Sequence, residues 1–140
     1  MITDPRPGLK ALLLSSPAIT APGGICPLVA KQGERRAQVV YSRTGGIGEH
    51  TLEGPIALAE TRFQFDAWAQ DIDTATALAD AIKHKLDGYS GTVTFGDDSP
   101  QDGVKFHGIF YDGREIESYD GEAKMYRVGR TYRVLYRERE

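Results

Sequence analysis

Two segments of the chain alternate apolar and polar residues with a period of two, which is typical of β-strands buried on one face. In the segment from Glu60 to Ala69, one face is apolar and the other carries charge and a tryptophan: Phe63, Phe65 and Ala67 oppose Arg62, Gln64, Asp66 and Trp68. The apolar face predicts a core contact. The polar face predicts a surface covered by water or by a partner.

The second alternating segment, Tyr126 to Arg137, predicts a long final strand. Arg130 interrupts its apolar face next to Gly129, which indicates a bulge or a contact with another subunit. The arginines of the opposite face have two interpretations, a solvated strand face or a contact between subunits. The apolar face holds Tyr126, Val128, Tyr132, Val134 and Tyr136, and the opposite face holds Arg127, Arg133 and Arg137.

A helical period predicts a helix from Asp71 to Leu86, which Asp71 or Asp73 can cap and Gly88 can end. A shorter helix is predicted from Leu9 to Ser15, after two prolines. The apolar face of the longer helix consists of Ala75, Leu78, Ala79, Ile82 and Leu86.

The remaining segments complete one α+β domain over residues 1–140, with an antiparallel or mixed sheet and two helices packed on one face. Asp112-Gly113 is a strong turn signal and predicts a hairpin between strands at 105–111 and 114–119. Residues 44–55 are rich in glycine and predict a flexible arm. Short extended segments are predicted at 25–30, 36–43 and 92–95.

Composition narrows the class of protein. The net charge of −3 argues against a dedicated nucleic-acid binder, which usually carries a basic excess. Cys26 is the only cysteine, so it cannot form an internal disulfide and fits a reducing cytoplasm. No apolar run is long enough for a membrane helix, and the early run from Ala11 to Leu14 is too short for a signal-peptide core.

Charge is unevenly distributed near the end of the chain. From Asp97 to Glu122 there are eight acidic residues and two basic ones, whereas residues 123–140 hold six basic and two acidic ones. The two stretches are compatible with a hairpin whose charges compensate each other. They are also compatible with a ring subunit whose oppositely charged flanks attract its neighbours.

No combination of residues forms a credible active site. The glycine run 44–48 lacks the helix start of a phosphate-binding loop, and Glu49, His50 and Glu53 lack a closing metal ligand. A nucleophile–base pair of Cys26 with His107 has no supporting spacing. We therefore expect no catalytic residue, no metal and no cofactor.

The order of short motifs along the chain resembles the tail completion (tail terminator) proteins of long-tailed phages, prophages and gene transfer agents. The resemblance covers nearly the whole chain. Its motifs are Leu9-Lys10-Ala11-Leu12-Leu13, Ile25-Cys26-Pro27-Leu28, Val39-Val40-Tyr41-Ser42-Arg43, His50-Thr51-Leu52-Glu53-Gly54-Pro55, the strand 62–69, Ala77-Leu78-Ala79-Asp80-Ala81-Ile82, Leu86-Asp87-Gly88-Tyr89-Ser90-Gly91, Gly108-Ile109-Phe110, Tyr126-Arg127-Val128 and Val134-Leu135-Tyr136-Arg137. Arg130 departs from the family, which has an apolar residue there.

The resemblance implies a structural virion protein and no enzyme. It implies a ring, typically a hexamer, assembled in the bacterial cytoplasm at the head-proximal end of a tail, with the tail tube protein and a head–tail connector protein as partners. The alternatives are a head–tail adaptor, or a small-molecule-binding domain with His107, Asp112 and the glycine loop as its site. Neither nucleic-acid nor membrane binding is implied. The candidate interface residues are Gly45, Gly46, Ile47, Gly48, His50, Leu52, Trp68, Arg127, Arg130, Arg133 and Arg137.

Overall fold

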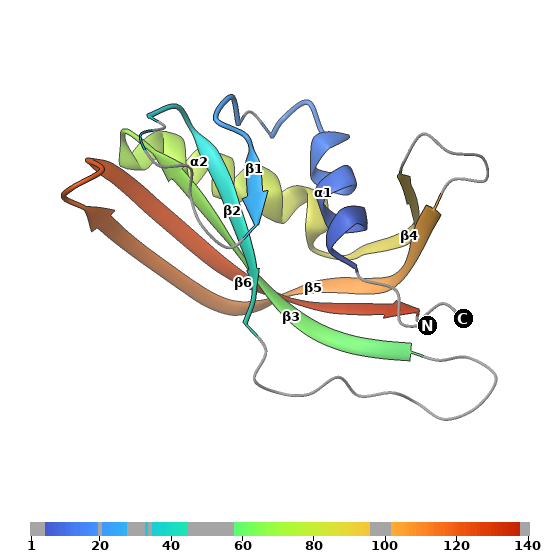
Figure 1. Cartoon of the computed structure of the whole chain (residues 1–140). Coiled ribbons are helices and arrows are strands. Elements are labelled where there is room, and N and C mark those ends of the chain that lie inside the picture. The colour runs from blue at the N-terminus through green and yellow to red at the C-terminus, as the bar shows by residue number, and fades with distance from the viewer. Residues whose placement is uncertain are drawn as a thin grey trace.

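A computed structural model describes residues 5–19, 21–27, 33, 35–44, 58–95 and 102–137 (Figure 1). The described residues form two helices and six strands. In chain order these are α1 (Arg6–Leu14), β1 (Ile25–Pro27), β2 (Gln38–Arg43), β3 (Leu58–Ala69), α2 (Ile72–Leu86), β4 (Tyr89–Phe95), β5 (Asp102–Asp120) and β6 (Met125–Arg137).

The strands form one mixed sheet in the order β1-β2-β3-β6-β5-β4. The β1–β2 pair is parallel and the other pairs are antiparallel. The sheet is curled, and both helices cover the same face of it (Figure 1). The α+β class and the two helices on one face are therefore confirmed.

The core lies between the helices and the concave side of this sheet. The predicted apolar faces of α2, β3 and β6 are all buried in it, and Phe65 packs edge-on against Tyr132 with ring centroids 5.7 Å apart. Asp71 caps α2, since its carboxylate accepts a 2.8 Å hydrogen bond from the Thr74 amide. A Cβ at Gly8 would lie 3.1–3.2 Å from Val104 and Phe106, so the absence of a side chain there lets α1 approach the sheet closely.

The predicted hairpin at Asp112-Gly113 is wrong. β5 continues through this dipeptide as one strand, and the register against β6 shifts between Tyr111 and Glu115. Gly113 has a φ of 88°, and the Asp112 carboxylate accepts a 3.2 Å hydrogen bond from the Arg114 amide. Positive φ at glycine serves a bulge as well as a tight turn, and the dipeptide alone does not distinguish them.

The actual hairpin turn joins β5 to β6 at residues 121–124. The Asp120 carboxylate accepts hydrogen bonds from the amides of Glu122 and Ala123, and Lys124 takes a positive φ of 55°. This turn brings the acidic half of β5 beside the arginine-rich half of β6. The described parts of the acidic and basic stretches therefore form a hairpin, as one of the two interpretations of the charge pattern required.

Candidate assembly surface

The sheet face opposite the helices, here called the open face, combines the polar sides of β3 and β6. The register sets Trp68 beside Arg127 and Arg62 beside Arg133. Because paired residues of antiparallel strands project to the same side, the tryptophan and the arginine stripe predicted from separate segments share one surface. Arg137, at the far end of β6, belongs to the same face.

Trp68 and Arg127 form the centre of the first cluster on this face. The Arg127 guanidinium lies 5.7 Å from the Trp68 ring centroid, and its Nε donates a 3.0 Å hydrogen bond to Ser118 Oγ. A guanidinium over an indole ring is a favourable cation–π geometry. Arginine and tryptophan are also the residues that protein interfaces concentrate.

Asp66 lies beneath this cluster and is only 7% exposed. Burial raises the pKa of its carboxyl, while a 2.7 Å hydrogen bond from Gln64 and the Arg127 guanidinium, 3.8 Å away, act to lower it. A Cβ at Gly129 would collide with the Asp66 carboxylate. The glycine next to Arg130 is thus explained by the close approach of this carboxylate rather than by a bulge in β6, whose register against β3 is continuous.

A second cluster surrounds Arg133, whose Nε lies 3.2 Å from a Glu60 carboxylate oxygen. The same guanidinium lies 5.8 Å from the Phe110 ring centroid. Arg62, the β3 neighbour of Arg133, lies 3.8 Å from Asp112 in the β5 bulge. The open face therefore presents arginines held in place by intramolecular contacts, beside an aromatic ring that is itself 41% exposed.

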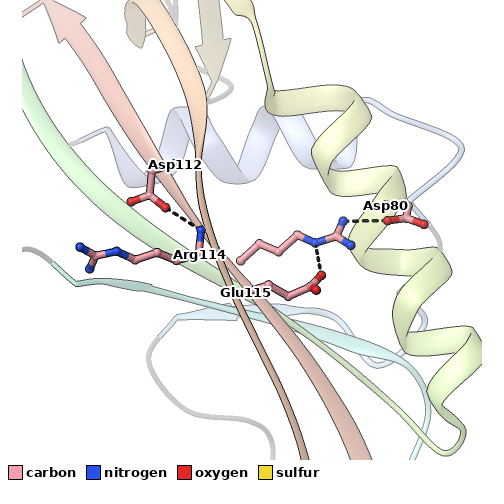
Figure 2. Close-up of polar contacts among 5 residues, drawn as sticks. Asp80, Asp112, Arg114 and Glu115 are labelled. Atoms are coloured by element: carbon pink, nitrogen blue, oxygen red, sulfur yellow. Dashed lines mark hydrogen bonds and ion pairs between the residues drawn. The ribbon is translucent and has the colours of Figure 1, made fainter.

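Arg130 lies on the opposite, helix-covered face, because it pairs with Phe65. Its guanidinium bridges two carboxylates at 2.7 Å, Asp80 of α2 and Glu115 of β5. Figure 2 shows these two carboxylates reaching the guanidinium from the helix and from the strand. Burial acts to lower the Arg130 pKa, but the two carboxylates outweigh it and raise the pKa. Sequence reasoning missed this contact because Asp80 is 50 residues away in the chain.

The second candidate surface is the outer side of β5. β4 pairs with β5 only as far as Ile109, so within the described residues no strand pairs with the outer side of β5 from Phe110 to Asp120. Ile116 and Tyr119 are 45% and 53% exposed on this stretch. An unpaired strand with exposed apolar side chains is a template for association, which makes this edge a candidate contact.

Cys26 and His107, the pair considered for catalysis, lie far apart. Cys26 is buried on β1, and His107 is exposed on β5. Three strands separate β1 from β5, so a spacing of about 4.8 Å per strand places them roughly 19 Å apart. Among the described residues, no group of three His, Cys, Asp or Glu side chains could hold a metal ion.

The candidates in the glycine-rich arm, Gly45, Gly46, Ile47, Gly48, His50 and Leu52, lie outside the described residues. At its start, the Thr44 amide donates a 3.0 Å hydrogen bond to the Arg62 carbonyl. In the described part of the chain, no helix is long and apolar enough to cross a membrane.

The fold and these surfaces define a class, an α+β domain with an open, arginine-bearing sheet face and an unpaired acidic strand edge. No family model matches the sequence, and no curated protein matches it. Among solved structures, the fold is similar to that of a chain in the virion of a native gene transfer agent (GTA) particle. The TM-score is 0.60, the identity is 16%, and the match covers 93% of this chain and 92% of that chain. This likeness establishes a shared fold over nearly the full length of both chains.

Proposed function

We propose that this chain is a structural virion protein that forms a ring, typically hexameric, at the head-proximal end of a phage-like tail. In this role it ends growth of the tail tube and provides the surface that joins the head. The protein works without catalysis or a cofactor. Its partners are further copies of itself, the tail tube protein and the head–tail connector protein.

The fold likeness to a gene transfer agent virion chain carries this proposal, because the match spans 93% of this chain and 92% of that chain. The order of tail-completion motifs in the sequence supports the tail terminator role within such a particle. The surfaces also fit an assembly subunit, since Trp68, Arg127 and Arg133 form an aromatic–arginine surface of the kind found at interfaces. The glycine-rich arm at 44–55 remains a predicted contact with a neighbour or the tube.

The test is polymerisation of the tail tube protein from the same genome, with and without the purified protein. We expect added protein to stop elongation and to appear as a ring on one end of each tube in negative-stain images. Tubes that grow to the same lengths with bare ends would contradict the terminator role. Binding to the isolated connector protein without any effect on tubes would instead support the head–tail adaptor.

A further inference from the structure

The two edges of the sheet differ in charge and in exposed apolar surface. The acidic edge is the unpaired part of β5 and the turn after it, residues 110–122, which hold five acidic residues and one basic residue, Arg114. Asp112 and Glu115 form ion pairs with Arg62 and Arg130 of the same subunit, so Glu117, Asp120 and Glu122 carry the charge that is left for a partner. The basic edge lies at the opposite side of the sheet, where, among the described residues, β1 pairs with β2 at three positions. It consists of the exposed Arg35 and Arg36, just before the beginning of β2.

The acidic edge has two features that protect a free strand, the bulge at Asp112-Gly113 and a 3.0 Å hydrogen bond from the Tyr111 amide to the Asp87 carboxylate, but it lacks others. Such strands are commonly short, or they carry lysine or proline, which discourage pairing. Residues 110–120 contain neither lysine nor proline. Four large apolar side chains are exposed in the described part of the chain, and three of them, Phe110, Ile116 and Tyr119, lie on this stretch. A surface with these properties favours a partner that supplies positive charge and covers the apolar side chains.

The basic edge supplies the positive charge that such a partner needs. Its arginines lie at the same end of the sheet as Glu117. Cross-strand pairing links Glu117 through Val128 and Ala67 to Val39, so Glu117 lies level with the beginning of β2. The segment that carries Arg35 is fixed there, because the Arg35 carbonyl accepts a 2.9 Å hydrogen bond from the Gln70 side chain. A neighbouring copy can therefore present its arginines beside the acidic edge without a large shift along the strands.

We propose that the acidic edge of one copy binds the basic edge of the next copy, and that this contact closes the ring. The inference rests on the proposed ring function and identifies the contact that builds the ring. Since the two edges are different surfaces on opposite sides of one sheet, the contact is heterologous, the type that generates rings when its rotation closes. Apolar contact by Ile116 and Tyr119 supplies contact area, and the opposite charges select the edge and the orientation.

Charge reversal on each edge tests this contact. In the described part of the chain, Glu117 has no ion-pair partner, so Glu117→Arg and Arg35→Glu change the edges with little effect on folding. Each variant alone should need at least about tenfold more protein to form rings, because like charges then face each other. Lys10→Glu, on the exposed side of α1, is the control and should assemble like the wild type. Thermal unfolding of each variant checks that the fold is intact.

An equimolar mixture of the two single variants provides the decisive result. In a ring that alternates the Glu117→Arg and Arg35→Glu variants, opposite charges meet at every contact, because the two reversed edges face each other and so do the two unchanged edges. The mixture should therefore recover assembly, as should the double variant.

Three outcomes distinguish failure of the proposed edge contact from failure of the proposed ring function. Single variants that form rings as readily as the wild type would overturn the edge contact while leaving the ring function in place. A Glu117→Arg variant that forms rings but no longer binds tube ends would show that the acidic edge contacts the tube protein instead. A wild-type chain that forms no ring, alone or with tubes, would overturn the proposed function and this inference with it.

Discussion

At the scale of single residues, Arg130 shows how a charge is accommodated on a strand face that is otherwise apolar. Its side chain is mostly buried, but both guanidinium contacts are made with carboxylates of the same chain, Asp80 and Glu115. The sequence identified Arg130 as an anomaly, and only the fold reveals its partners. These contacts join α2, β5 and β6, which assigns Arg130 a role within the subunit.

Replacing Arg130 with methionine should therefore lower stability and leave ring assembly intact. The loss should be on the order of 1 kcal/mol, because Asp80 and Glu115 are partly solvated and regain water when the guanidinium is removed. Urea denaturation measures the change, and added salt should shrink it. Loss of rings at unchanged stability would instead identify Arg130 as an interface residue.

Asp66 provides a pH test at the same scale. Its folded-state pKa lies above the ordinary value of 3.8, chiefly because of burial, so the folded state binds a proton more tightly than the unfolded state. The ionised carboxylate therefore costs stability above the folded-state pKa, and this cost disappears as the pH falls toward 3.8.

We expect Asp66→Asn to be at least as stable as the wild type at pH 7, with any advantage vanishing in acid. Urea midpoints of both proteins across pH 3.5 to about 7 measure this difference. An Asp66→Asn protein that is clearly less stable at neutral pH would mean that the Arg127 and Gln64 contacts outweigh the burial of the charge.

Among the helices and strands, the sequence predicted the ones that are specified by neighbouring residues, through a helix cap or a hydrophobic period. The cap at Asp71 and the helical period placed α2, and alternation placed the faces of β3 and β6. Strand order was not predictable in this way, because β6 inserts between β3 and β5 through contacts distant in the chain. The same limit applies to the surfaces, since Trp68 and Arg127 meet only through the β3–β6 register. The turn signal at Asp112-Gly113 was misleading because it marks a bulge.

Gly113→Ala tests that bulge. Nothing lies within 4 Å of a Cβ at this position, so the only penalty is the positive φ of 88°, which should cost about 1 kcal/mol. Gly121→Ala is the matched control, because its surroundings are equally open and its φ is not positive. Thermal unfolding of the two variants should separate them by a few degrees. Equal stability would argue that β5 relaxes without the bulge.

At the scale of the whole molecule, the sheet has one face covered by helices, one open face and two edges of opposite charge. This fold is similar to that of a chain in a gene transfer agent virion over 93% of the present sequence. A subunit of this design leaves association surface exposed when it is alone, which fits a protein that completes its structure by assembling.

The proposed function requires the protein to assemble into a ring. It is tested most directly by light scattering on a size-exclusion column, followed by negative-stain images of the same peak with and without tail tubes. We predict closed rings of one uniform mass, in solution or seated on tube ends. A protein that stays monomeric at all concentrations and leaves tube ends bare would contradict the proposed function.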